Sequence, residues 1–483
     1  MISEVTVKTS MASTACAFLL RLALAGGLVL GFAMAVRGGG PKCVAGTSYF
    51  DPTTTGQALA WQLGQIAYFT DQGDLSPILP NASANNLVAG AFSVWTSVPT
   101  AALAAVRGGS LAEDVNGSNV IVNGDGTISM PADVESTAVG TPIGIVYDSD
   151  GSVTSALLGA GAGDSGQCFF NAVFRGNDNY GALASYQHAL VVIDGQCAQQ
   201  NSQLTDVQYR LVRVIGGVLG LGWSQLNVNV QSGSPYPSAD DYAGFPAMYF
   251  MDVWNCVPIA TCYPNPLQLS MDNMAAVSRL YPVTAQNQAN FPGKQIFSAT
   301  TSRIHLSVYF SDAHGNRTQP MQGVNVVARW IDPNTHQASR RYAVSSVSGF
   351  AFRGNGGNPI TGFDDSIGDP LAEWGSTNSS VEGFFDLAGL APPTGAQYQL
   401  SVEAIDPKWS AGVGPYSPGP VSPSGSFQPV TVTVAPGGDV QQDIVMTGNA
   451  QPLSQAASSW TSPLPLPSGG DWGGSFASYA DVD

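Results

Sequence analysis

The chain has 483 residues, which is enough for two or three domains that each bury a core. Hydrophobic residues make up 44% of it and charged residues only 11%, a composition that excludes general disorder. The 17 Lys+Arg are outnumbered by 34 Asp+Glu, and the net charge is −17. An acidic chain without a basic run argues against binding to nucleic acid or to an anionic membrane surface.

The N-terminus predicts an export signal. Arg21 precedes an apolar run over residues 22–36, which is shorter than the roughly 18 residues that a spanning helix needs. Ala33-Met34-Ala35 is typical of a cleavage site. We therefore expect a signal peptide over 1–35, a leader over 36–59, and a secreted or cell-envelope protein with no membrane span after cleavage. An uncleaved anchor helix is the alternative.

Export implies an oxidising compartment in which disulfides form. Cys256 and Cys262 flank a short loop, and Cys168 and Cys197 bracket a hairpin-like region, so these are the two candidate bridges. Cys43 is then the odd cysteine, either free or paired between chains. The sequence does not fix this connectivity.

Residues 60–283 are predicted to form one α+β unit. Strands are expected at "QIAYFTDQG", on both sides of the Asn-Gly-Asp-Gly turn in "SNVIVNGDGTISM", in "TPIGIVYDSDGSVTSALLG" and in "HALVVID". Helical spacing runs over 81–106 and over 203–219, the most apolar helix of the chain. A last helix, "DNMAAVSRLYP", is expected to begin at Ser270 or Asp272 and to end at Pro282.

The second half changes pattern after a polar linker at 284–301. Short alternating strands separated by turn residues run from 302 to 447, a pattern typical of an all-β sandwich. A segment rich in Gly, Asn, Asp and Ser interrupts them at 354–380. Residues 448–483 form a low-complexity tail rich in Ser, Pro and Gly.

The helix at 203–219 ends in "VLGLGWSQ". Arg213 and Gly217 are four residues apart and therefore share one face. Zinc peptidases place two His at this spacing so that both reach one ion, with a Glu beside the first His as general base. A glycine then allows the sharp turn that brings a third His back to the metal. Gly220 stands where that turn glycine is expected.

This segment resembles the matrixin-type branch of the metzincin peptidases, and the likeness extends over about half the chain. Its elements, in order, are Trp61 with "IAYFTD", "LVAGAFSVWTSVPT", the helix from Tyr209, "GFPAMYF" and "DNMAAVSRLYP". The resemblance implies an α+β fold with a mixed sheet and a long active-site-type helix. It also implies that Met248 is the turn methionine that lies under the metal.

The departures from the family pattern concern every catalytic position. The first zinc His falls on Arg213, the catalytic Glu on Val214, the second His on Gly217 and the third His on Trp223. A guanidinium stays protonated and cannot bind a cation, and valine can transfer no proton. Glycine has no side chain, and an indole is no practical zinc ligand. We therefore expect no zinc cofactor and no catalytic residue. We also expect the Trp223 indole to fill the former metal site over Gly217, with Arg213 stacked on it.

Three other motifs are weaker. Gly163 to Gly166, Gly-Asp-Ser-Gly, resembles the nucleophile loop of chymotrypsin-like proteases, but His188 follows it instead of preceding it, which favours a turn. The stretches 148–152 and 123–126 resemble short calcium loops, with hairpin turns as the alternative. Asp240, Asp241 and Asp252 are candidate hard-cation ligands or solvated loop carboxylates. Calcium thus remains an alternative cofactor.

Residues 302–447 resemble the carboxypeptidase regulatory-like family of small β-sandwiches. The matching features are the strand at Gly323-Val324, the turn at Gly383-Phe385-Leu387 and the strand at Gly395-Tyr398-Leu400. The resemblance implies an immunoglobulin-like sandwich that serves as a spacer or a binding module.

Together these features predict an exported binding or structural protein built on an inactivated zinc-peptidase domain. Its expected partner is an extracellular or envelope protein or a polysaccharide. The alternatives are an active secreted metallopeptidase that uses non-standard ligands, and a calcium-dependent adhesin.

Overall fold

The computed structural model describes residues 40–46, 49–226, 238–249, 268–352, 375–403 and 425–447. Several predictions lie outside these residues. They concern the export signal, the Cys256–Cys262 bridge, Asp252, most of the inserted segment at 354–380 and the C-terminal tail. Among the described residues, no helix is long and apolar enough to cross a membrane.

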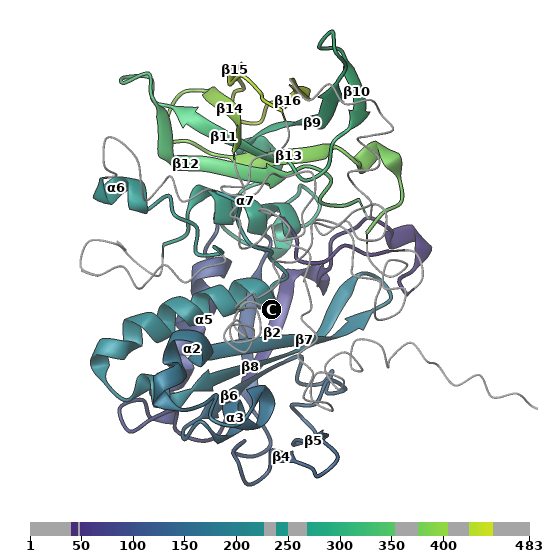
Figure 1. Ribbon diagram of the computed structural model, residues 1–483. Coiled ribbons are helices and arrows are strands. Elements are labelled where there is room, and N and C mark those ends of the chain that lie inside the picture. Colours follow the sequence, from purple (N-terminus) through teal and green to yellow (C-terminus); the bar gives the residue numbers. More distant parts are fainter. Residues whose placement is uncertain are drawn as a thin grey trace, which may run out of the picture.

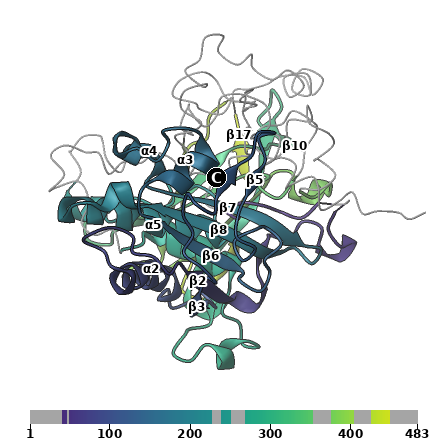
Figure 2. The same ribbon diagram turned by 90° about the horizontal axis from the view of Figure 1, so that it is seen from below.

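The first half of the chain is built around a six-stranded, largely parallel sheet (Figures 1 and 2). Strands β1, β8, β6, β2 and β3 follow one another across it and run parallel, and β7 pairs antiparallel with β8. The strands are β1 (Ala60–Trp61), β2 (Gln65–Thr70), β3 (Ala104–Ser110), β6 (Ile143–Asp148), β7 (Val173–Gly181) and β8 (Ser185–Asp194).

The central strands are covered on both faces. Every residue of β6 is buried, as its unbroken apolar run requires of a central parallel strand. Ile143, Ile145 and Tyr147 face one core together with helices α2 (Asn81–Thr96) and α5 (Leu204–Val218). Val146 faces a second core with α3 (Ser152–Leu158), so the helices lie on opposite sides of the sheet (Figure 1).

Two of the sequence expectations for this half were wrong. The helix predicted over 81–106 ends at Thr96, because residues 104–110 pair with β2 as strand β3. The stretch 152–158, expected as a strand, is helix α3, because its first N–H groups are capped by Asp148 and Val153 packs against the sheet. In both segments tertiary packing outweighs the local preference for helix or strand.

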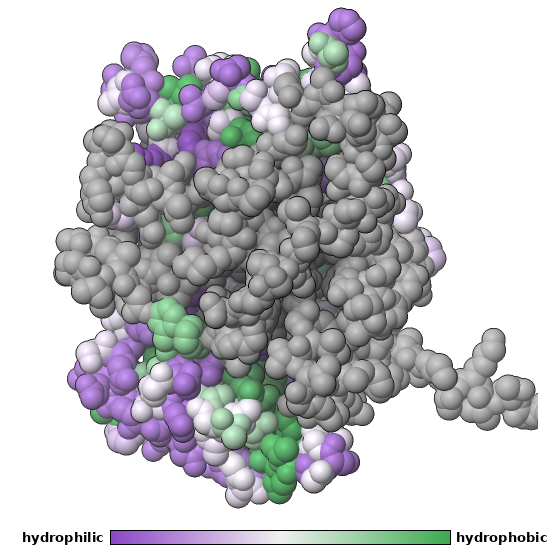
Figure 3. Space-filling view, viewed as in Figure 1, coloured by the Kyte–Doolittle hydropathy of each residue, from purple (hydrophilic) through white to green (hydrophobic). Residues whose placement is uncertain are grey.

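The Asn-Gly-Asp-Gly turn forms a hairpin. Strands β4 (Ile121–Val122) and β5 (Ile128–Ser129) pair antiparallel, and Asp125 accepts hydrogen bonds from the backbone and hydroxyl of Thr127. Ile121 and Val122 stay exposed. Figure 3 shows apolar surface at the lower end of the molecule, where Figure 1 places this hairpin.

The second half contains two separate sheets that share one core. One has the order β10-β9-β13, with β16 and β17 also pairing with β9; the other has the order β12-β11-β14-β15 and is antiparallel throughout. The first comprises β9 (Ser302–Ser311), β10 (Arg317–Pro320), β13 (Phe384–Leu390), β16 (Asp439–Gln441) and β17 (Ile444–Met446). The second comprises β11 (Asn325–Ile331), β12 (Ala338–Val347), β14 (Gln397–Glu403) and β15 (Val430–Thr433).

Helix α7 (Met271–Leu280) belongs to both cores. It begins at Ser270, whose side chain accepts a hydrogen bond from the N–H of Asn273. Ala276 and Val277 pack into the core of the large sheet, whereas Met271 and Ala275 pack into the core of the second half. The two halves are therefore joined by a buried helix (Figure 1).

The stretch predicted as a polar linker also packs. Phe291 is buried, and the Lys294 ammonium donates hydrogen bonds to the carbonyls of Thr96 and Val98 at the end of α2. The remaining short elements are α4 (Cys168–Asn171), α6 (Ala239–Tyr242), α8 (Phe297–Thr300) and 3-10 turns at Pro52–Thr54, Gln62–Gly64, Ser165–Gln167, Gly195–Ala198, Asn201–Gln203, Gln288–Asn290 and Ser379–Val381.

Candidate functional site

Helix α5 ends in a turn that requires a glycine. Gly220 has a φ of 93°. The N–H of Leu221 donates to the carbonyl of Gly216 at 3.0 Å, and the N–H of Gly220 donates to the carbonyl of Gly217 at 2.9 Å. This pair of bonds is a Schellman motif, in which a glycine follows the last helical residues in the left-handed conformation. The predicted sharp turn is present and aims the following residues back along the helix.

The chain after this turn brings Trp223 to Arg213. Trp223 is buried, and the Arg213 guanidinium carbon lies 5.2 Å from the centre of its ring. The same guanidinium lies 5.5 Å from the ring of Tyr209 and donates through Nη2 to the Tyr249 carbonyl at 2.7 Å. The stacking predicted between Arg213 and Trp223 is therefore present, and Val214 beside it is fully buried.

The space beside Gly217 is filled by Arg175, not by Trp223. A Cβ built on Gly217 would overlap the guanidinium of Arg175, with Cζ at 2.5 Å, and the three nearest atoms all belong to that side chain. Arg175 extends from β7 and is 5% exposed. Sequence reasoning missed it because nothing local links residue 175 to residue 217.

Met248 lies against the same helix one residue earlier. A Cβ at Gly216 would meet the Met248 sulfur and would lie 2.6 Å from Cζ2 of Trp95. Asn273 holds the backbone just before Met248 in place, because its side-chain oxygen accepts a hydrogen bond from the N–H of Ala247 at 2.6 Å. Close packing on both sides explains why this helix carries two adjacent glycines in spite of their low helix propensity.

These residues do not fit a zinc ion. The positions that the sequence comparison assigned to metal ligands hold a guanidinium, a glycine filled by a second guanidinium, and an indole. In the described part of the chain, no group of three or more His, Cys, Asp or Glu side chains is placed to hold a metal. Two guanidinium groups beside a divalent cation repel it by several kcal/mol at an effective dielectric of about 20.

A second group of polar residues lies at the carboxyl edge of the large sheet. Asp71 follows β2, Asp148 ends β6 and Asp194 ends β8, and these three strands are neighbours. All three side chains are at most 1% exposed. The sequence carries a signal for this group, since "IAYFTD", "GIVYD" and "VVID" each end an apolar strand on Asp.

These buried carboxylates accept backbone hydrogen bonds. Asp71 accepts from Val115 and Tyr147 at 3.0 Å, and Asp148 from Val153 and Thr154 at the start of α3. Burial raises the pKa of Asp71 to about 6 and that of Asp194 to about 7. Burial also raises the pKa of Asp148. The carboxylates hold loops in place, and their oxygens are not arranged around a cation.

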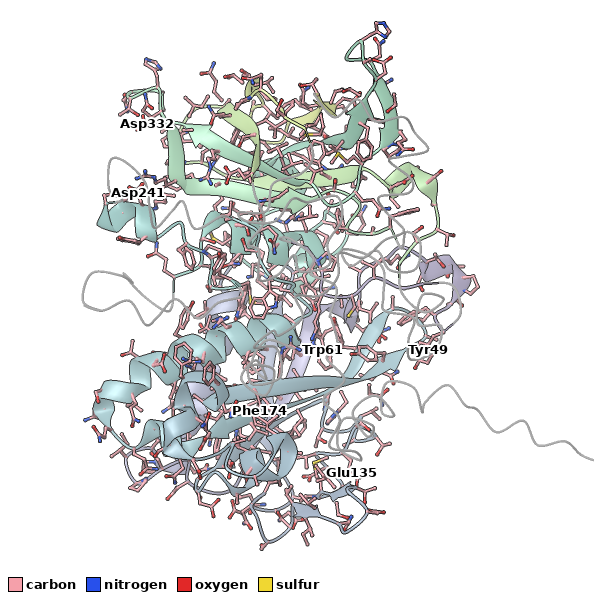
Figure 4. All side chains as sticks on the ribbon, viewed as in Figure 1. Tyr49, Trp61, Glu135, Phe174, Asp241 and Asp332 are labelled. Carbon is pink, nitrogen blue, oxygen red and sulfur yellow. A yellow bond between two sulfur atoms is a disulfide. The ribbon has the colours of Figure 1, made fainter. Side chains whose placement is uncertain are left out.

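The other predicted motifs are structural turns. The stretch at Gly163 to Gly166 enters a 3-10 turn, and His188 is fully buried on β8. Asp241, which is labelled in Figure 4, forms a capping box with Ser238 at the start of α6. Asp240 pairs with Arg341 of β12. Neither carboxylate belongs to a metal-binding group among the described residues.

A disulfide joins Cys168 to Cys197, which confirms this predicted pair. It ties α4 to the 3-10 turn that follows β8, next to Asp194. Among the described cysteines, Cys43 has no disulfide partner, and it is partly exposed.

No family model and no curated protein matches the chain. Among solved structures, the crystal structure of (S)-allantoin synthase is similar at 12% identity over 51% of this chain and 79% of that chain, with a TM-score of 0.15. A TM-score this low carries no argument about fold or function.

Proposed function

We propose that the protein is an exported binding or structural protein whose first half is a matrixin-like, metzincin-type scaffold without a catalytic centre. Its second half is proposed to be an immunoglobulin-like sandwich of the carboxypeptidase regulatory-like type that acts as a spacer or binding module. The expected partner is an extracellular or envelope protein or a polysaccharide.

The observation that carries this proposal is the guanidinium of Arg175 against Gly217. A peptidase of this type needs a cation, a general base and a water molecule on this face of α5. Arg175 and Arg213 instead put two positive charges there, both at most 5% exposed. Val214, at the position of the general base, has no proton to exchange.

Metal analysis and a digestion assay on one preparation of the full chain test the proposal. After dialysis against zinc and removal of excess metal, we expect less than stoichiometric zinc, an unchanged melting temperature with a chelator, and no cleavage of casein. One tightly held equivalent of zinc per chain, or chelator-sensitive cleavage of casein, would refute the loss of the catalytic centre.

The export part of the proposal has its own test. The chain is produced with residues 1–35 in place, and the cells are separated into cytosol, envelope and medium. We expect the protein in the envelope or the medium, with a new N-terminus close after Ala35 by protein sequencing. A protein that stays in the cytosol with an intact N-terminus would refute export.

A further inference from the structure

A cavity of about 540 Å³ opens beside the start of the large sheet, well within the size range of ligand sites. It lies between β1, the β7–β8 turn and the segment after α7, and Trp61 in its wall stands at mid-height of the molecule (Figure 4). None of the described residues that line it is acidic or basic. Its amide and aliphatic hydroxyl side chains are those of Gln57, Gln62, Gln65, Ser185, Gln187, Thr284, Asn287 and Asn290.

Two leucines in the lining are exposed to solvent. Leu63 is 78% exposed and Leu183 is 63% exposed. Leu63 has a φ of 59°, and Leu183 precedes Ala184, whose φ is 53°. A left-handed conformation costs a non-glycine residue about 1–2 kcal/mol, and an exposed leucine gains nothing from burial. Backbone outliers of this kind collect at binding sites.

The wall that presents these residues is firmly held. Gly64, next to Leu63, packs so closely on the Ala102 carbonyl that a Cβ would overlap it. The N–H of Ala60 donates to the Ala184 carbonyl at 3.2 Å, and the Tyr281 hydroxyl accepts from the N–H of Trp61 at 3.0 Å. The cavity is therefore formed before any ligand arrives, which lowers the entropic cost of binding.

The amide side chains point to a ligand rich in hydroxyl groups. An amide offers both donors and acceptors, as a hydroxyl does, so the two can pair in either sense. Gln62, Gln65 and Gln187 are exposed, and within the described part of the chain their side chains make no hydrogen bond. A lining without charge favours a neutral ligand, because a buried unpaired charge is strongly unfavourable.

The common modes of peptide recognition fit this lining poorly. Strand addition needs a free strand edge several residues long, whereas β1, the edge strand beside the cavity, has only two residues. Polyproline segments need exposed aromatic rings, but Trp61, Tyr281 and Phe291 are all buried. Acidic motifs need arginine clusters, and none of the described lining residues carries a positive charge.

We propose that this cavity binds a segment of an uncharged polysaccharide. The sugar hydroxyls pair with the amides, and the Leu63 and Leu183 side chains pack against the C–H faces of the sugar rings. The inference deepens the proposed function and rests on it in one respect, since a polysaccharide is one of the partners proposed there. Among the described residues, the cavity shares no lining residue with the Arg213 and Gly217 face of α5, so it does not depend on whether that face is active.

Affinity electrophoresis of the full chain tests the inference. Gels contain dextran, a β-1,3-glucan, a β-1,4-glucan or a mannan, with polygalacturonate as the charged comparison. We expect retardation by at least one neutral polymer, competition by the matching hexasaccharide, and little change with salt, since no charge takes part. No retardation by any neutral polymer, or retardation only by polygalacturonate, would overturn the inference.

Variants separate binding from stability. Leu63→Gly relieves the backbone conformation, so we expect equal or higher thermal stability together with about tenfold weaker polymer binding. Gln187→Leu is expected to weaken binding to a similar degree. Val139→Ala removes an exposed apolar side chain outside the cavity and serves as the control.

Three results would contradict the assignment to this cavity. They are unchanged binding in Leu63→Gly and Gln187→Leu, an equal loss in Val139→Ala, and displacement of the polymer by an uncharged peptide at lower concentration than by the hexasaccharide. The zinc and casein assays on the same preparation report on α5 alone, so a failure there leaves this result standing.

Discussion

The guanidinium of Arg175 on β7 fills the space beside the backbone of Gly217 on α5, although the two residues lie far apart in the sequence. Gly217 has no side chain, and Arg175 takes the volume that one would occupy. Arg213, one turn earlier on the helix, stacks on Trp223. The face of α5 that carries Arg213 and Gly217 is thus filled by packed side chains, two of which are positively charged.

Replacing Gly217 tests this packing. Gly217→Leu is expected to lower the free energy of unfolding by about 1–3 kcal/mol, because the new side chain collides with the buried Arg175 guanidinium. Urea denaturation measures the loss. Gly90, in the interior of α2, is the matched control: its nearest neighbour would lie 3.8 Å from a Cβ, so Gly90→Ala is expected to gain up to about 1 kcal/mol. A Gly217→Leu variant as stable as the parent would show that the site has room.

The buried carboxyls at the sheet edge predict a pH dependence. Burial raises the pKa of Asp71 to about 6 and that of Asp194 to about 7, from an ordinary value of 3.8. Between about pH 4 and pH 7 the folded chain therefore binds more protons than the unfolded chain. The free energy of unfolding should fall as pH rises through this window, by at most about 1.4 kcal/mol per pH unit for each carboxyl.

Asp194→Asn isolates one of these groups. The amide keeps an oxygen for the N–H of Gln196, which donates to Asp194 at 2.9 Å, and it cannot titrate. We expect a shallower slope between pH 5 and 7 in urea denaturation, whereas Asp125→Asn in the exposed hairpin turn leaves the slope as it is. Equal slopes in Asp194→Asn and the parent would contradict the assignment.

The Cys168–Cys197 disulfide joins residues with a sequence separation of 29. Its removal in the double variant Cys168→Ser/Cys197→Ser is expected to cost about 3 kcal/mol, chiefly through the freer unfolded chain. Non-reducing peptide mapping of the parent should recover this pair and Cys256–Cys262, with Cys43 unpaired or joined to a second chain. Full thiol reactivity of the mature cysteines would contradict both bridges and the export proposal.

Asp272 on α7 connects the two halves of the molecule. It is fully buried and accepts hydrogen bonds from Ser345 of β12, from the backbone N–H at 2.7 Å and from the hydroxyl at 3.1 Å. Asp272→Ala leaves the Ser345 N–H without its acceptor and is expected to cost about 1–3 kcal/mol by thermal or urea unfolding. Asp241→Ala, which removes the half-buried carboxylate that completes the capping box of α6, should cost less. An Asp241→Ala variant that loses as much unfolding free energy as Asp272→Ala would contradict this role of Asp272.

The sequence by itself determined the elements whose pattern is strong over its whole length. The apolar runs of β6 and β8, the spacing of α5, the Ser270 cap of α7 and the Gly220 turn follow from local rules, because each residue there favours the state that it adopts. The sequence also predicted that Arg213, Val214 and Gly217, none of which can bind zinc, lie on this helix.

Only the tertiary structure decided which side chains meet. Arg175 reaches Gly217, and Asp71, Asp148 and Asp194 gather at one edge, because strand order brings distant segments together, and no local period encodes that order. Two segments with a weak sequence pattern differ from their predicted secondary structure for the same reason. Residues 104–110 pair in the sheet as β3, and residues 152–158 form α3 on its face. Burial and backbone pairing outweigh local preferences of a few tenths of a kcal/mol per residue.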